Sequence, residues 1–329
     1  MRLIILKLLI TVFVLTLSVS VSAAMTIKIG VLPTKGTTWA NCLDKLTKEV
    51  SDATKGEVLF KMYYGAVQGD EPVVLRKIRN GQMHGGVFTG RTLGEINGDV
   101  RIMEVPFTFY ENRSKAFKVM DKFAPIFNEG FKLNKFKNLG FFEVGQVYLI
   151  STKRASTFNE LKGLKIWSWD GDVLSSTLIK SMNFVAVPLA LPDVLPSLST
   201  GAIDAAYASP LAILAMQWQT KVKFLVDFPV TYSIGAFLVQ ENVWEKIPQQ
   251  YRSVVEEIAR KNIQQANELT IKENVDALKT IHDLKITFVK FPEQDIQQGK
   301  KIRNEVISSL TGKLFSSKIV DLMNKELQL

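Results

Sequence analysis

Two tryptophans and two aspartates are the residues of this sequence whose types and spacing point most clearly to chemistry. They stand in the stretch LKGLKIWSWDGD, where Trp167 and Trp169 are followed directly by Asp170 and Asp172. Residues two apart in a strand project from the same face, so both indoles should lie on one side. Together they offer a broad apolar area, ring stacking and one N–H donor each. This surface is suited to binding an organic molecule.

The two aspartates are also the nearest approach to a catalytic carboxylate pair. The residues after them, DVLSSTLIKSM, have a helical pattern, and aspartate is favoured at a helix N-terminus, so capping explains both more simply. Only two histidines occur, His84 and His282, without metal-ligand spacing, and no nucleophile elbow, Walker loop or GxGxxG pattern is present. We therefore expect no enzyme, no metal and no cofactor.

The first 24 residues read as a cleaved export signal. Arg2 and Lys7 precede an apolar core, and the small residues of SVSVSAAM fit cleavage after Ala23 or Ala24. The apolar core is shorter than the roughly 20 residues of a membrane-spanning helix. No cysteine follows it closely enough for lipidation. The sequence thus predicts a soluble protein exported to the periplasm.

Composition limits the remaining chain of about 305 residues, which is long enough for two domains. Its single cysteine, Cys42, excludes an internal disulfide and any multi-cysteine metal site, and an exported chain without disulfides suits a periplasm. The formal charge is +9, or +7 without Arg2 and Lys7, but the basic residues are scattered. A generally basic surface is favoured over nucleic-acid binding.

Apolar runs alternate with amphipathic stretches along the first part of the chain. The segments 26–32 and 58–64 have strand patterns, and the segments 39–55 and 71–81 have helical spacing that ends at a glycine. This alternation predicts an α/β fold with a mainly parallel sheet that helices cover on both faces.

An internal repeat divides the chain into two similar parts. VLRKIRNGQMHGGVF (74–88) aligns with VLPSLSTGAIDAAYA (194–208) at a constant offset of 120 residues. Each copy has the pattern of a helix, a glycine that ends it and a short strand. The strand contains glycine or alanine residues, whose small side chains leave room for a ligand. Ligands of open α/β sheets bind beyond the carboxyl ends of the strands. The repeat thus predicts two lobes that face one shared cleft.

The last third predicts one long helix, from a first-turn proline at 248 to about residue 283. At 1.5 Å per residue it would span roughly 50 Å and reach across both lobes. Strict heptads are not sustained, which argues against a coiled coil. The segment 284–291 returns to a strand pattern, and a polar helix follows.

Three stretches resemble landmarks of the substrate-binding proteins of TRAP transporters, the DctP family. They are FNELKGLKIW, VPLALPDVLPSLSTGAIDAAYASP and ENVWEKIPQQYRSVVEEIA, and the segments QGDE (68–71) and VPFTFYENRSKAFKV (105–119) fit the same family. The resemblance implies a two-lobed, type II-like periplasmic binding protein that closes on a small organic solute. It also implies delivery of that solute to TRAP permease subunits driven by an ion gradient.

Two departures from the family pattern concern the ligand. Family members usually carry an arginine directly after LKGLKI, which pairs with a substrate carboxylate, and this chain has Trp167 there. The usual Glu-Asn-Pro after the Val-Asp strand is replaced by AAYASP. The sequence is closer to a subgroup with a Trp-x-Trp-x-Gly-Asp strand end, which implies an apolar cleft. That subgroup includes proteins paired with a helical-repeat periplasmic partner.

The candidate site of the second lobe is the Trp167 and Trp169 surface, continued by Asp170 and by residues after the neighbouring strand. The alternative is that one tryptophan simply packs under the following helix. The residues that continue the wall are Tyr207, Ser209 and Trp218.

The first lobe should contribute residues at the matching strand end. Arg91 is either a receptor for an anionic group or a surface arginine at the sheet edge. Phe107 and Phe237 stand where the chain is expected to cross between lobes, and either could be ordinary core. The contributors from this lobe are Gln68, Asp70, Phe88, Thr89, Arg91 and Phe237.

The expected domain organisation follows from the hinge strands 141–150 and 232–239. Lobe I comprises residues 25–148 and 237–279, and lobe II comprises residues 149–236 and 280–329. Closure is expected as a hinge motion around the solute.

The leading function is a periplasmic receptor for an aromatic or otherwise apolar carboxylate. The alternatives are a ligand-dependent sensor, a hydrophobic-ligand carrier with a helical-repeat partner, and an enzyme on the same scaffold. The enzyme would need a reactive pair in the cleft. Neighbouring genes for permease subunits would distinguish transport from sensing.

Overall fold

The computed structural model describes residues 24–109 and 112–327, so the predicted export signal lies outside the described residues except for Ala24. Ten strands form one mixed sheet in this part of the chain. The strands are β1 (Met25–Val31), β2 (Val58–Tyr63), β3 (Gly85–Thr89), β4 (Phe136–Ser151), β5 (Lys165–Trp169), β6 (Val185–Leu189), β7 (Ala205–Ala208), β8 (Phe224–Val226), β9 (Thr231–Gln240) and β10 (Thr287–Val289).

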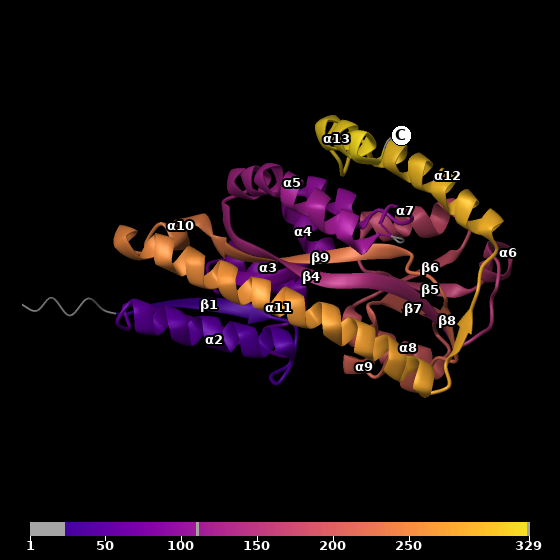
Figure 1. Cartoon of the computed structure of the whole chain (residues 1–329), viewed down its shortest axis with the longest axis horizontal. Coiled ribbons are helices and arrows are strands. Elements are labelled where there is room, and N and C mark those ends of the chain that lie inside the picture. Colours follow the sequence, from indigo (N-terminus) through magenta and orange to yellow (C-terminus); the bar gives the residue numbers. More distant parts are fainter. Residues whose placement is uncertain (1–23, 110–111, 328–329) are drawn as a thin grey trace, which may run out of the picture.

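Helices cover both faces of the sheet (Figure 1). The α-helices are α2 (Thr38–Ala53), α3 (Glu71–Arg79), α4 (Gly90–Ile96), α5 (Arg113–Leu133), α6 (Phe158–Leu161), α7 (Val173–Ser181), α8 (Val194–Thr200), α9 (Pro210–Ala215), α10 (Glu241–Trp244), α11 (Gln249–Asp283), α12 (Glu293–Leu310) and α13 (Ser317–Leu327). Short 3-10 turns are η1 (Gly98–Glu104), η2 (Leu191–Asp193) and η3 (Trp218–Thr220). No helix among the described residues is long and apolar enough to cross a membrane.

The strand order β2-β1-β3-β9-β4-β7-β5-β6 builds two lobes on one sheet. Lobe I is formed around β1, β2 and β3, and lobe II around β5, β6 and β7, with parallel pairing inside each set. The expected mainly parallel sheet is thus found at both ends. The centre differs, because β9 runs antiparallel to β3 and β4, and β4 runs antiparallel to β7.

The long strand β4 belongs to both lobes. Its residues 136–147 pair with β9, and its last four residues pair with β7. The register shifts at Gly140 and Gly145, whose φ angles of 156° and 108° favour glycine. The predicted hinge segments 141–150 and 232–239 lie inside β4 and β9, so both are strands that connect the lobes.

The predicted long helix is present as α11, which is 35 residues and therefore about 50 Å long. Pro248, expected in the first turn, occupies the N-cap position just before the helix and makes no side-chain capping bond. Val255 and Ile263 pack in the lobe I core with α2, whereas Ile281 packs in the lobe II core. Figure 1 shows α11 running along both lobes, so the helix joins them from outside the sheet.

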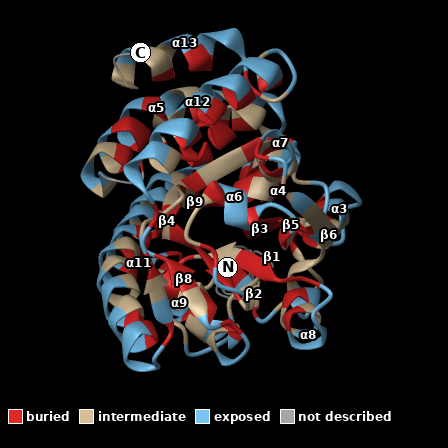
Figure 2. Ribbon diagram, turned by 90° about the vertical axis from the view of Figure 1, so that its right-hand side faces the viewer, coloured by how far each residue is buried: buried red, intermediate tan, exposed pale blue. Residues whose placement is uncertain are grey.

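Helix starts follow the capping residues that the sequence offers. The Asp70 side chain accepts a hydrogen bond from the backbone N–H of Glu71 at the start of α3. Asp172 accepts from the N–H groups of Leu174 and Ser175 at the start of α7. Buried residues gather on the strands and on the inward helix faces (Figure 2). The sheet core thereby fixes these helix N-termini at the strand ends.

The internal repeat corresponds to two matching units, α3–β3 in lobe I and α8–β7 in lobe II. The aligned glycines Gly81 and Gly201 have nearly equal φ angles of 73° and 72°. This left-handed conformation ends each helix and turns the chain into the following strand. Each strand then points its carboxyl end toward the gap between the lobes.

Replacing either glycine by alanine is expected to destabilise the fold by about 1 kcal/mol, because a side chain is strained at positive φ. A Cβ atom at either position meets nothing within 4 Å, so backbone strain is the whole cost. Urea unfolding should show a similar loss in the free energy of unfolding for each alanine variant. In the double variant the two losses should add. The asparagine variants should lose less, and a marked inequality between the sites would contradict their structural equivalence.

Candidate functional site

A cavity of about 830 Å³ lies between the two lobes. Its lining includes Thr89 at the end of β3, Trp169 at the end of β5 and Ala208 at the end of β7. Carboxyl ends of parallel strands from both lobes thus border one space, as in other open α/β sheets. Its volume falls in the range of roughly 300–1,000 Å³ that small-molecule sites occupy.

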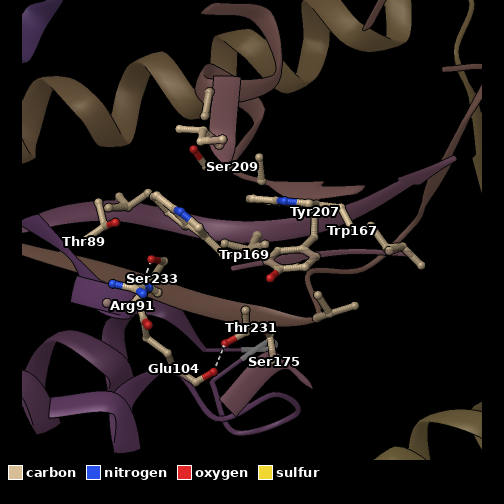
Figure 3. A pocket seen from close by; sticks show the side chains of 18 of the residues that line it. Thr89, Arg91, Glu104, Trp167, Trp169, Ser175, Tyr207, Ser209, Thr231 and Ser233 are labelled. Carbon is tan, nitrogen blue, oxygen red and sulfur yellow. Dashed lines mark hydrogen bonds between the residues drawn. The ribbon is translucent and has the colours of Figure 1, made fainter. Parts of the chain in front are cut away.

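Four aromatic rings form a connected wall of the cavity. Trp167 stacks on Tyr207 with ring centroids 4.9 Å apart and meets Trp218 edge-on at 5.6 Å. The rings of Trp167 and Trp169 are 5.9 Å apart, and both border the cavity. Figure 3 shows the rings of Trp167, Trp169 and Tyr207 between Ser209 on one side and Glu104 and Ser175 on the other. Period-two alternation on β5 therefore puts both indoles beside the same space.

Both indole N–H groups already have partners in the protein. Trp167 donates to the backbone carbonyl of Leu189 at 3.1 Å. Trp169 donates to a carboxylate oxygen of Asp70 at 3.2 Å, which links lobe II to lobe I. In this conformation the indoles offer a ligand their ring surfaces rather than their hydrogen-bond donors.

The cavity continues past the aromatic wall into an apolar region beneath α7. Its residues come from α7, from the loop after β8 and from the segment after β10. They belong to one core cluster or pack against it. The side chains include Leu178, Ile179, Met182, Phe184, Phe228 and Phe291. All six of these side chains are apolar.

A buried ionic cluster lies where the two lobes meet the cavity. Arg101 of η1 donates to both carboxylate oxygens of Asp172 at 3.0 Å and lies 3.3 Å from Glu104. Glu104 also accepts from Ser233 Oγ at 2.5 Å and from the N–H of Ile234 at 3.1 Å. Burial raises the pKa of Glu104, opposed by the Arg101 charge. The cluster joins lobe I to the N-terminus of α7.

Arg91 makes a second contact between the lobes. Its Nε donates to the carbonyl of Asp170 at 3.1 Å, and its guanidinium pairs with Glu95 at 2.9 Å. The Arg91 side chain is 13% exposed and borders the cavity. Arg91 thus lines the cavity and is held in place by protein groups.

Glu71 is a buried carboxyl group in the cavity lining of lobe I. It accepts hydrogen bonds from the N–H of Thr89 at 2.9 Å and from its hydroxyl at 3.0 Å. Burial raises its pKa to about 7, against the effect of the Thr89 hydrogen bonds. This carboxyl group therefore titrates near neutral pH.

Replacing Glu71 by glutamine should change how stability depends on pH. Between about pH 4.5 and 7 the unfolded carboxyl ionises while the folded one keeps its proton, so the original protein loses stability as pH rises. The glutamine variant has no such loss. From pH 4.5 to 7, its free energy of unfolding minus that of the original protein should therefore rise by at most about 3 kcal/mol. Urea unfolding at several pH values measures this. For an exposed control, Glu268→Gln, the difference in unfolding free energy from the original protein should not change with pH. The same flat result for Glu71→Gln would show that the pKa of Glu71 is not raised.

Most of the site residues predicted from the sequence border the cavity, and the others lie outside its lining. The predicted residues that border the cavity are Trp167, Trp169, Tyr207, Ser209, Trp218, Thr89 and Arg91, together with Phe107. Gln68 accepts from Lys77, and Asp70 caps α3 and bonds Trp169. Asp170 meets Arg91 through its backbone carbonyl. Phe88 and Phe237 are fully buried in the core.

The polar residues that sequence reasoning missed come largely from η1 and β9. Arg101 and Glu104 stand three apart in the apolar run VRIMEVPF, and charges in such a run are a signal of a buried ion pair. The missed lining residues also include Glu71, Ser175, Thr231 and Ser233.

The family of the chain is decided by its match to a sequence profile. Residues 29–313 match the bacterial extracellular solute-binding proteins of family 7, DctP. The chain belongs to this family. This family consists of extracellular solute-binding proteins, so the chain is a solute-binding protein rather than an enzyme.

Curated relatives support the same membership. A solute-binding protein of Chromohalobacter salexigens is 30% identical over 166 residues, which are 50% of this chain and 49% of that protein. A solute-binding protein of Verminephrobacter eiseniae is 25% identical over 231 residues, or 69% of this chain and 68% of that protein. The chain thus spans about half the length of the first of these relatives.

Solved structures of TRAP periplasmic solute-binding proteins share the fold. The protein from Desulfovibrio salexigens with bound orotic acid has a TM-score of 0.84 and 20% identity, covering 92% of this chain and 99% of that one. The protein from Haemophilus influenzae with bound L-gulonate has a TM-score of 0.83 and 19% identity, covering 92% and 99%. At these identities the likeness establishes the two-lobed fold of this DctP protein.

Proposed function

We propose that this DctP protein captures a mainly apolar organic molecule between its lobes and delivers it to a TRAP-type permease in the membrane. The aromatic wall would bind an aromatic or branched apolar group by its ring surfaces. The region beneath α7 would hold a further apolar portion of the same molecule. The sequence predicted an aromatic or apolar carboxylate as the ligand. The aromatic wall and the region beneath α7 support the aromatic or apolar group of that ligand, and they do not bear on its carboxylate.

The observation that carries the proposal is the environment of Trp167. The family resemblance places a carboxylate-binding arginine at this position, and here an indole stacks on Tyr207 beside the cavity. The guanidinium groups that do border the cavity, on Arg91 and Arg101, are already paired with carboxylates. A sugar acid would thus not find the usual cation, and much of the wall it would meet is aromatic or aliphatic.

The proposed binding cycle uses the predicted lobe boundaries, 25–148 with 237–279 and 149–236 with 280–329. The contacts of Trp169 with Asp70 and of Arg91 with Asp170 join the lobes beside the cavity. Opening would break these contacts, with bending in β4 and β9, and a bound ligand would favour the closed state. The protein would act in the periplasm after export, and the helical-repeat partner stays a prediction from the sequence.

A thermal-shift comparison tests this function. Phenyl- and alkyl-containing compounds with different head groups should stabilise the protein, by about 2.7 kcal/mol at a hundredfold excess over Kd. D-glucuronate and D-galacturonate at equal concentration should give no shift. Stabilisation by a uronate and by none of the apolar compounds would overturn the proposal.

A further inference from the structure

The charges around the cavity bear on the head group of its ligand. Among the described lining residues, four carry a carboxyl group, two carry a guanidinium group, and none is lysine or histidine. The formal charge of the lining is therefore −2. The charged residues are Glu71, Glu104, Asp172, Glu273, Arg91 and Arg101.

Both guanidinium groups already have a carboxylate partner in the protein. The Arg101 guanidinium contacts the carboxylates of both Asp172 and Glu104, and its side chain is only 6% exposed. Arg91 pairs with Glu95 and bonds the Asp170 carbonyl. Burial raises the pKa of Glu71 and Glu104, and with both protonated the lining would still reach only zero charge. The lining is not positive at any protonation state near neutral pH.

An anion entering this cavity would lose its hydration without gaining a free cation. Burial of an unpaired carboxylate is costly, and nearby carboxylates add repulsion. The polar groups that remain for a ligand are neutral or acidic. The Tyr207 hydroxyl is buried near Ser175 and Asp172 and has no partner at hydrogen-bond geometry.

We propose that the ligand carries no net negative charge, so that this site selects an uncharged or cationic apolar molecule instead of an organic anion. This inference rests on the proposed function and narrows its ligand class. A hydroxyl or amide group of the ligand can bond the Tyr207 hydroxyl, and an amide N–H or an ammonium can donate to the carboxylates. The apolar part of the ligand then lies on the aromatic wall and beneath α7.

Two head-group series test the inference on the intact protein at pH 7.5. One comprises 4-phenylbutanoate, 4-phenylbutanamide and 4-phenylbutylamine, and the other octanoate, octanamide and octylamine. Within each series the apolar skeleton stays the same. Calorimetric titration should give the amide or the amine at least about tenfold tighter binding than the carboxylate. A carboxylate that binds as tightly as its amide overturns the inference, while the proposed apolar-ligand function stands.

Failure of all six compounds to bind counts against the proposed function and the inference together. A variant pair adds a second readout. Glu104→Gln removes one negative charge beside Arg101 and should narrow the amide-to-carboxylate preference several-fold. Glu268→Gln makes the same charge change at an exposed site on α11, where screening should leave the preference unchanged. Equal effects of the two variants would exclude a role for the lining charges.

Discussion

Replacement of Trp169 by alanine is expected to weaken binding of an apolar ligand by 10- to 100-fold, or about 1.4–2.7 kcal/mol. The half-buried ring borders the cavity and lies 5.9 Å from Trp167, so its removal takes away stacking surface and opens the aromatic wall to water. Calorimetric titration with 4-phenylbutanamide measures the change.

Two variants separate ring contact from other effects of the substitution. Trp169→Phe keeps an aromatic ring but loses the N–H bond to Asp70, and should retain most of the affinity. Trp244→Ala removes a buried indole in lobe I that does not border the cavity, so it should lose stability but not affinity. Undiminished binding by Trp169→Ala, or equal losses in Trp169→Phe, would contradict the role of the ring surface.

Replacement of Arg101 by methionine should destabilise the protein by about 3–5 kcal/mol. The change leaves Asp172 and Glu104 buried without the cation that both contact. Urea unfolding at neutral pH measures the loss. The loss should shrink toward acid pH, because the two carboxyl groups can then accept protons and need no counter-charge.

Arg79 provides the matched control for this prediction. Its side chain is 50% exposed and pairs with Glu95 at 2.7 Å on the surface, where ion pairs contribute at most about 1 kcal/mol. Arg79→Met should therefore cost little at any pH. A loss in Arg101→Met no larger than in Arg79→Met would mean that the cluster contributes nothing beyond a surface pair.

The features that local sequence patterns determine could be predicted before the structure. Alternation on β5 put Trp167 and Trp169 on one face, and the glycine stops at Gly81 and Gly201 identified the repeated unit. The length and apolar spacing of α11 predicted a helix along both lobes. Each of these depends on residues close together in the chain, so local periodicity was enough.

The same alternation rule shows that two neighbouring residues predicted for the site in lobe I, Phe88 and Thr89, cannot both face the cavity. Phe88 and Thr89 are neighbours on β3, so their side chains take opposite faces. Thr89 borders the cavity, and Phe88 is fully buried in the core cluster that includes η1 residues. Phe237 likewise packs on Phe60 at 5.8 Å in the lobe I core, since β9 is the central strand.

The ionic cluster could not be derived from the sequence, because its members are distant along the chain. Asp172 lies 71 residues from Arg101, and Ser233 lies 129 residues from Glu104. The strand β9 returns between β3 and β4, and its residues Ser233 and Ile234 hold Glu104 of η1. Sequence reasoning could assign Asp172 its capping role but not its second partner, and it therefore missed how acidic the lining is.

Native mass spectrometry of protein purified without refolding is the most direct test of an apolar interlobe site. The protein should release a bound organic molecule rich in carbon relative to oxygen, and Trp169→Ala should release far less of it. Release of a sugar acid or another hydrophilic anion, at equal occupancy in both proteins, would contradict the account.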